Sequence, residues 1–342
     1  LLFQAVEEAL VTAYKKNFGS NQNVRVDMNK VTGELHIYAQ RHIVAEVGDD
    51  PNEISLEEAR KIDPRYEVDD IVETEVTPRN FGRIAAQNAK QVVVQRIREA
   101  ERGMVFEKFS SRENDIVTGI IQRMENKNVY IDLGKAEAIL TPNEQIPGEI
   151  YQYHDRMKTY IEEVKKTSKG PQIMVSRTHP GLLKRLFERE VPEIHDGLVE
   201  IKSVAREPGM RSKISVYTKD ENIDPVGACV GHKGMRVQTI VNELRGEKID
   251  IVKYSSEPDQ YVANALSPAK VVSTEVLEEE KICRVIVPDY QLSLAIGKEG
   301  QNARLAAKLT GWKIDIKSES QAAEEAEQGA QEVGVAYEAD ED

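Results

Sequence analysis

The N-terminal part of the chain changes from a helical pattern to strand-like patterns. Apolar side chains recur at three- and four-residue spacing over residues 1–16, which predicts a helix. Alternating apolar and polar positions over residues 24–28, 35–39 and 43–45 predict strands joined by turns. This part should therefore form a small α/β layer.

An acidic segment and a long helix follow. Residues 49–75 carry eleven acidic side chains and three basic ones, which fits either a solvated face or a surface that docks a protein. After Pro78 the apolar period is helical as far as residue 108. At 1.5 Å per residue this helix is about 40 Å long, so we expect it both to pack on its own domain and to connect that domain to the next.

The pattern then changes to short strands. Alternating runs stand at residues 116–121, 129–133, 136–140, 157–164 and 173–176. Five short strands in this space predict a small closed barrel, and the OB-fold is the commonest five-stranded barrel. Tyr130 falls on the strand face opposite Ile131, where a ring either belongs to the core or stacks on a base. Arg123 and Lys135 lie near it in sequence and are candidate RNA contacts.

An internal repeat dominates the C-terminal part. Gly231-His232-Lys233-Gly234 recurs as Gly297-Lys298-Glu299-Gly300, and residues 244–251 (LRGEKIDI) recur as 309–316 (LTGWKIDI) with six identical positions. Each copy predicts a strand, a short helix that ends at G-x-x-G, a second helix and a strand. Neither the P-loop pattern nor the G-x-G-x-x-G fingerprint is present.

A helix, G-x-x-G, helix unit is suited to phosphate. Glycines let the backbone turn with its N–H groups unobstructed, and the next helix N-terminus favours an anion. The KH module clamps about four nucleotides of single-stranded nucleic acid in this way. Glu299 should make the second loop the weaker one. Aspartate at Gly231 or Gly297 should weaken binding without unfolding the domain. The candidate RNA-binding residues are Gly231, His232, Lys233, Gly234, Arg236, Gly297, Lys298, Glu299, Gly300, Gln301 and Arg304.

Charge changes the picture only locally. The chain carries a net charge of −13, and its last 25 residues, from Ser318, hold nine acidic and no basic side chains. The rest holds 46 basic and 50 acidic residues, so nucleic acid must be bound by shaped sites rather than by a general basic excess. The C-terminal segment is expected to be a disordered acidic tail, acting either as a solubiliser or as an electrostatic competitor of RNA at the second KH unit.

Composition and motifs exclude several classes. No apolar run is long enough to span a membrane. Two cysteines give neither a disulfide framework nor a metal cluster, which favours the cytoplasm. The six histidines are scattered and no nucleophile or cofactor motif is present, so we expect no enzyme, no cofactor and no metal. The chain starts without Met inside a helical pattern, so part of the natural N-terminus is expected to be missing.

The order of these modules resembles that of the NusA family of bacterial transcription factors. The most specific strings stand at residues 81–87 (FGRIAAQ), 169–178 (KGPQIMVSRT), 224–231 (DPVGACVG) and 291–298 (QLSLAIGK). The resemblance implies docking on RNA polymerase, through Arg83 and Gln87, and binding of nascent RNA by the barrel and both KH domains. It also implies other antitermination factors as partners and control of pausing, termination and antitermination.

The resemblance gives a multidomain α+β organisation, with the chain expected to be a monomer. It comprises an α/β polymerase-binding domain with the long helix (1–108), an OB-fold barrel (109–178), two tandem KH domains (179–254 and 255–317) and the tail (318–342). Short connections predict one semi-rigid RNA surface. Two alternatives stay open: an RNA-processing enzyme, although polynucleotide phosphorylase places such modules after large catalytic domains, and a ribosome-associated protein, although those are usually basic.

Overall fold

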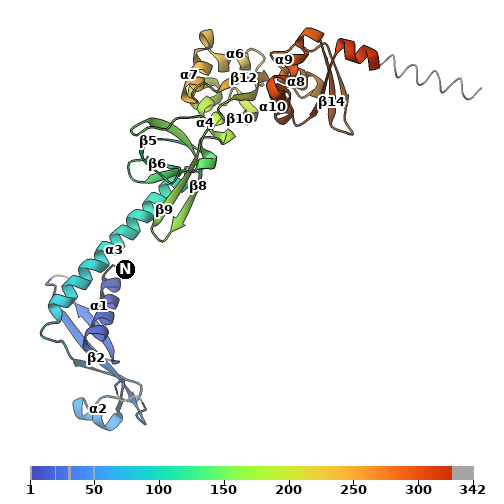
Figure 1. Ribbon diagram of the computed structural model, residues 1–342. Coiled ribbons are helices and arrows are strands. Elements are labelled where there is room, and N and C mark those ends of the chain that lie inside the picture. Colours follow the sequence, from blue (N-terminus) through green and yellow to red (C-terminus); the bar gives the residue numbers. More distant parts are fainter. Residues whose placement is uncertain (1, 20, 30–31, 49–50, 326–342) are drawn as a thin grey trace, which may run out of the picture. The chain divides into compact units, whose positions relative to one another are not determined.

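The computed structural model describes residues 2–325 except 20, 30–31 and 49–50, and the chain divides into two compact units, residues 1–104 and 105–342. In the first unit, two helices pack on a sheet (Figure 1). They are α1 (Leu2–Phe18) and the start of α3 (Phe81–Ser110). Leu10, Tyr14, Ile37 and Phe81 are among the buried side chains that join helices and sheet, as the helical spacing of the apolar residues requires.

The sheet of the first unit has four strands. β2 (Leu35–Val44) pairs antiparallel with β1 (Asn23–Met28) and β4 (Ile71–Glu75), and parallel with β3 (Glu53–Ser55). The two strands expected at residues 35–39 and 43–45 are therefore one. The acidic segment is more structured than a plain solvated face, because it holds β3, β4 and helix α2 (Leu56–Ile62), which together enclose Ile54, Ala59 and Val72.

The second unit begins with the predicted barrel. Its five strands close in the order β5-β6-β7-β9-β8 around an aliphatic core. Phe109, in the last turn of α3, packs into that core. The strands are β5 (Ile116–Glu125), β6 (Asn128–Asp132), β7 (Glu137–Leu140), β8 (Arg156–Thr167) and β9 (Gly170–Ser176), and the short helix η1 (Pro142–Glu144) follows β7.

Two KH units follow, and their three-stranded sheets have the same topology, as the repeat predicts. In each, a three-stranded sheet has one antiparallel and one parallel pair, and the G-x-x-G loop joins the two helices between its last two strands. The first has α4 (Pro180–Glu190), α5 (Pro192–His195), β10 (Glu200–Glu207), β11 (Arg211–Tyr217), α6 (Pro225–Val230), α7 (Met235–Glu243) and β12 (Lys248–Lys253). The second has α8 (Pro258–Ala265), β13 (Ser273–Leu277), β14 (Ile282–Val287), α9 (Leu292–Ile296), α10 (Gln301–Thr310) and β15 (Lys313–Ser318).

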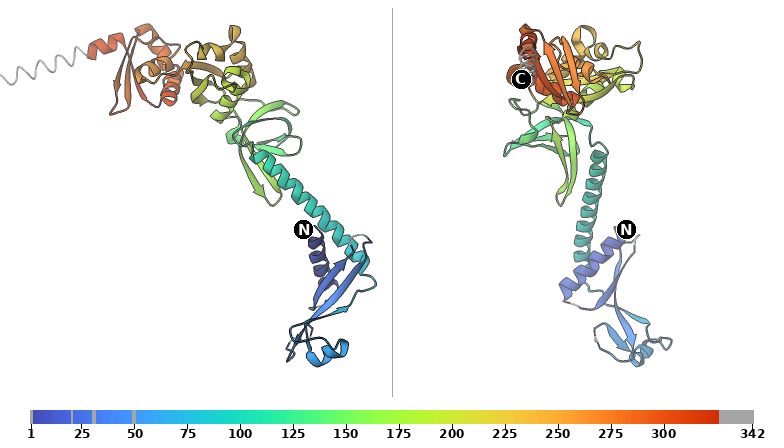
Figure 2. Two further views of the ribbon diagram at one scale, coloured as in Figure 1. Left: turned by 180° about the vertical axis from the view of Figure 1, so that it is seen from behind. Right: turned by 90° about the vertical axis from the view of Figure 1, so that its right-hand side faces the viewer.

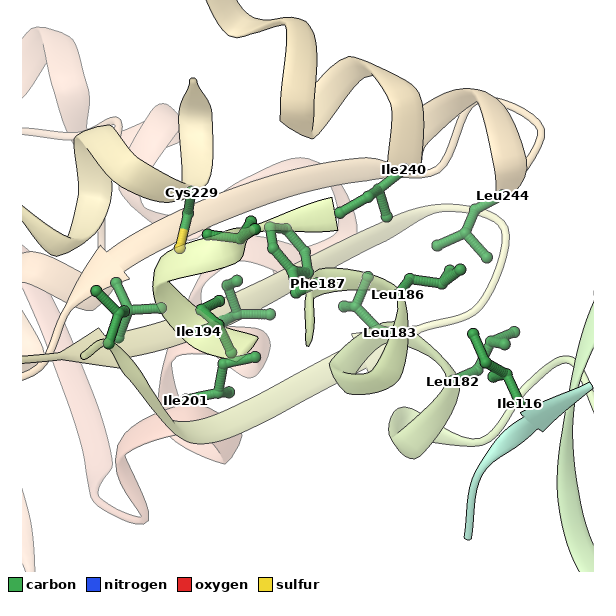
Figure 3. Close-up of a cluster of buried hydrophobic side chains, with 14 of the residues drawn as sticks. Ile116, Leu182, Leu183, Leu186, Phe187, Ile194, Ile201, Cys229, Ile240 and Leu244 are labelled. Atoms are coloured by element: carbon green, nitrogen blue, oxygen red, sulfur yellow. The ribbon is translucent and has the colours of Figure 1, made fainter. Parts of the chain in front are cut away.

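The hydrophobic cores of the second unit cross the module boundaries. Ile116 of the barrel belongs to the same buried cluster as Leu182 and Phe187 of α4 (Figure 3), and Tyr160 of the barrel is a further member. Ala205 and Val252 of the first KH sheet belong to the core of the second KH unit. Shared cores, rather than tethers, join the three modules, which supports the expectation of one semi-rigid surface.

The beginning of the expected tail differs from the prediction. Ser318 is the buried last residue of β15, and residues 319–325 are helical (Figure 2). The Ser320 hydroxyl donates to Asp289 Oδ2 at 2.8 Å, which ties this helix to the domain. The rest of the expected tail, residues 326–342, lies outside the described residues.

Candidate nucleic-acid interface

The two G-x-x-G loops have the same backbone conformation. Gly231 and Gly297 have φ of 72° and 78°, and Gly234 and Gly300 have φ of 75° and 72°. The third residue of each loop is also left-handed, with φ of 50° at Lys233 and 54° at Glu299. Sequence repetition has thus produced two copies of one strained turn, and strain of this kind concentrates at functional sites.

The two glycines of a loop are required for different reasons. A Cβ on Gly231 would lie 2.6 Å from Arg236 Cγ, and one on Gly297 would lie 2.8 Å from the backbone nitrogen of Asn302. A Cβ on Gly234 or Gly300 would meet nothing within 4 Å, so these glycines serve the left-handed backbone and leave open space. A Cβ at Gly231 or Gly297 would force these neighbours to shift, and the expectation that aspartate there leaves the fold intact stays a prediction.

The middle of each loop is exposed and is followed by an uncapped helix. His232, Lys233, Lys298 and Glu299 are exposed. The N-cap residues of α7 and α10 are glycines, so no side chain caps either first turn. The first N–H of each helix is bonded inside the loop, from Met235 to His232 O and from Gln301 to Lys298 O. The N–H groups that follow in the first turn of a helix, beside a lysine, favour a phosphate oxygen.

Arg236, a predicted RNA contact, supports the loop. Its Nη1 donates to Ala228 O at 2.6 Å and to Glu193 Oε2 at 2.8 Å. Asn302 takes the equivalent place in the second KH unit, where its Nδ2 donates to Ala295 O at 3.0 Å. Both side chains hold the carbonyl end of the helix that precedes the loop, so they position the loop glycines. This role was not visible in the sequence.

Gln301 and Arg304, also predicted RNA contacts, join the two KH units. Arg304 Nε donates to Glu207 Oε1 at 2.6 Å, and Gln301 Nε2 donates to Glu207 Oε2 at 2.8 Å. The Arg304 hydrogen bond is the main reason that the pKa of Glu207 lies below its ordinary value. Glu207, which the sequence did not single out, therefore fixes α10, the helix after the second loop, to the first KH unit.

The lowered pKa of Glu207 predicts a pH-dependent interface. Its contribution to stability should be complete above the ordinary glutamate pKa of 4.5 and should be lost as the pH falls through the lower folded-state pKa. We expect Glu207→Gln to lower the free energy of unfolding by about 1 kcal/mol at pH 7, because Arg304 is half exposed. The difference from the parent should shrink as the pH is lowered below 4.5 and vanish once Glu207 is protonated in the folded state. Urea unfolding followed by the fluorescence of Trp312 would check this, and a pH-independent difference would contradict it.

In the barrel, a neighbouring arginine covers the predicted stacking ring. Ile131 is buried and Tyr130 points to the other face, as expected. The guanidinium carbon of Arg123 lies 3.7 Å from the centre of the Tyr130 ring. Glu125 and Glu137 hold Arg123 there at 2.6 and 2.8 Å. A base could stack on this face of Tyr130 only by displacing a paired arginine, whereas Lys135 is exposed in the next turn.

The remaining candidates lie in the first unit, where Arg83 and Gln87 are exposed one turn apart on α3. Within the described residues no group of three or more His, Cys, Asp or Glu side chains could hold a metal ion. No helix in the same part of the chain is long and apolar enough to cross a membrane.

Comparisons with known proteins account for nearly the whole chain. Residues 1–103 match the NusA N-terminal domain, 110–176 the S1 RNA binding domain, 177–254 the NusA-like first KH domain and 258–324 the NusA-like second KH domain. The transcription termination/antitermination protein NusA of Bacillus subtilis is 66% identical over 95% of this chain and 87% of its own length. The chain belongs to the NusA family.

Other members of the NusA family give the same result. NusA of Halalkalibacterium halodurans is 66% identical over 95% of this chain and 85% of its own. NusA of Thermus thermophilus is 43% identical over 92% of this chain and 84% of its own. Both are named as transcription termination/antitermination proteins. Membership confirms the predicted order of an N-terminal NusA domain, an S1 barrel of the OB type and two RNA-binding KH domains.

Proposed function

We propose that the protein holds nascent single-stranded RNA on its two G-x-x-G loops while residues 1–104 dock on RNA polymerase, and that it thereby alters pausing, termination and antitermination. The observation that carries this proposal is the matched pair of exposed loops, each with left-handed glycines and an uncapped helix start. A single loop could be an ordinary helix cap. Two copies on a shared core favour a ligand that extends past both, and single-stranded RNA is such a ligand.

In this proposal the barrel is a secondary RNA contact, made through Lys135 and, after rearrangement, through Arg123 and Tyr130. Other antitermination factors are further partners. The protein acts as a monomer in the bacterial cytoplasm, without a cofactor and without enzymatic activity. Family membership supports the role in transcription, since the named relatives are transcription termination/antitermination proteins.

The docking role of the first unit is tested with the full chain. We expect Arg83→Glu combined with Gln87→Ala to reduce capture of core RNA polymerase at least about fivefold, the factor that corresponds to a loss of about 1 kcal/mol when an important interface side chain is removed. Both side chains are exposed, so the fold should survive. Capture on the immobilised chain is the measurement.

Lys61→Glu, an exposed site with the same charge reversal in the same unit, is the matched control and should capture polymerase normally. Equal capture by the two variants would remove this face of α3 from the proposal. A transcription assay with a hairpin terminator completes the test, and the Arg83 and Gln87 variant should then lose its effect on termination while still binding free RNA.

A further inference from the structure

The two KH sheets place equivalent side chains on equivalent faces. The repeated octet makes Asp250 and Asp315 counterparts. In the first sheet Lys213 is the register partner of Asp250, and in the second sheet Arg284 is the partner of Asp315. Register partners lie side by side on one face of a sheet. Each sheet therefore carries a basic and acidic pair at the centre of the face that turns away from its own helices.

In the first KH unit this face is covered. The helices α8 and α10 of the second KH unit pack against β10, β11 and β12 of the first KH unit. The Lys213 side chain is 0% exposed and its Nζ donates to Ser267 O at 2.7 Å, just beyond α8. A lysine buried in this way needs its acceptors, so the face is built to receive another element of the chain.

In the second KH unit the same face is open. The side chain of Arg284, the counterpart of Lys213, is 52% exposed. Leu277, Ile282 and Ile286 share the face with Arg284 by register, and all three lie outside the hydrophobic core. Three partly exposed apolar side chains around an arginine resemble the first sheet as it would be without its cover.

The chain itself reaches the edge of this face. Ala322 and Glu325, in the helix after β15, line a cavity of about 420 Å³ together with Arg284, Ile286 and Lys317. Glu325 also forms an ion pair with Lys317. Residue 326 therefore follows directly from a segment that already contacts the open face.

We propose that residues 326–342 dock in cis on the open face of the second KH sheet, formed by β13, β14 and β15. Arg284 on this face is already paired with Glu275 at 3.4 Å, and Lys317 with Asp315 at 3.8 Å and with Glu325, so the proposal rests on the position of the segment and on its apolar side chains rather than on its charge.

The apolar positions of the segment also fit. Val333, Val335 and Tyr337 alternate with small or polar residues, so an extended segment places all three on one side. Val333 and Tyr337 are then about 13 Å apart, which is also the separation of residues four apart in β14, such as Ile282 and Ile286. In arrays of repeated units the last unit needs a cover of its own, and the docked segment supplies it.

A spin label tests the contact in the full chain. Both native cysteines are fully buried and therefore unreactive, so Ala336→Cys can be labelled selectively with a nitroxide. The amide signals of residues 284–286 and 315–317 should lose more than half of their intensity in the oxidised label and recover in the reduced one. The same label with Arg284→Glu, at an exposed site, should broaden them much less.

Each other result overturns the proposal. Broadening centred on Gly297–Gly300 would place the segment on the RNA loop, as an electrostatic competitor. Weak broadening spread over the chain would mean that the segment stays in solvent. Broadening of an isotope-labelled chain by a separate spin-labelled chain would show that the contact forms between two copies.

Discussion

Aspartate at the two middle positions of both G-x-x-G loops should weaken the binding of single-stranded RNA by about 100-fold or more. The substitutions are His232→Asp and Lys233→Asp in the first loop, with Lys298→Asp and Glu299→Asp in the second. A hydrogen bond to a charged group contributes about 1.5–3 kcal/mol, so removing one phosphate hydrogen bond in each loop already accounts for this factor. The first-loop pair should have the larger effect, because it removes a lysine and adds two carboxylates.

The loop fold should tolerate these four substitutions. The replaced side chains are exposed, both glycines of each loop are kept, and aspartate accepts the left-handed backbone at positions 233 and 299. Fluorescence anisotropy with a labelled RNA over a salt series is the measurement, and the salt slope should fall by about 0.7 for each phosphate that the protein no longer neutralises. Asparagine at the same four positions removes the lysines without adding carboxylates, so its loss of affinity should be smaller than that of the aspartate variant. If the aspartate variant bound within twofold of the parent, the loops could not be the RNA site.

The largest expected effect on stability comes from Arg177, where the barrel meets the first KH unit. Its side chain is 1% exposed and ion-pairs with Glu149, which is 2% exposed. Its guanidinium also donates to Lys158 O of β8 at 2.8 Å and to Glu243 O of α7 at 3.1 Å. Arg177→Met would remove the nearer of the two cations paired with the buried Glu149 carboxylate, since Arg245 lies 3.9 Å from it, and breaking a buried pair costs about 3–5 kcal/mol.

Hydrogen exchange measures that loss locally. The opening free energy of amides in β8 and α7 should fall together in Arg177→Met, since one side chain binds both elements. Arg177→Met combined with Glu149→Leu should recover part of the loss, because no charge is then buried alone. Arg112→Met is the control, as its ion pair with Asp115 is about 40% exposed on both sides and should contribute less than about 1 kcal/mol. An effect of Arg177→Met no larger than that of the control would mean that this junction is not held by the ion pair.

Local patterns predicted most of the fold because most helices and strands have apolar side chains at the spacing that is typical of their type. The barrel strands and the helices around both loops were found from apolar spacing and from the repeat. The sequence did not predict β10, because a bulge between Ile201 and Ser203 interrupts its alternation. In addition, the second KH unit covers its outer face, so that face shows no regular polar pattern. β3, α2 and β4 were missed because acidic side chains dominate their sequence.

The site was predicted as far as its chemistry is local. The loop residues came directly from the motif. The supporting roles of Arg236, Gln301 and Arg304 could not be predicted, because their partners lie elsewhere in the sequence; Glu207 is 97 residues from Arg304. A basic or polar side chain beside a phosphate motif gives the same sequence signal whether it contacts RNA or holds the scaffold.

The shared cores of the second unit have a consequence for the lifetime of an RNA complex. Because Ala205 and Val252 are buried in the second KH unit's core, the distance between the two loops is set by packing. Once one loop holds an RNA, the other meets the same strand at a fixed effective concentration rather than by a new collision. We expect avidity to appear at the RNA length that reaches both loops, where residence time rises steeply while the association rate changes little.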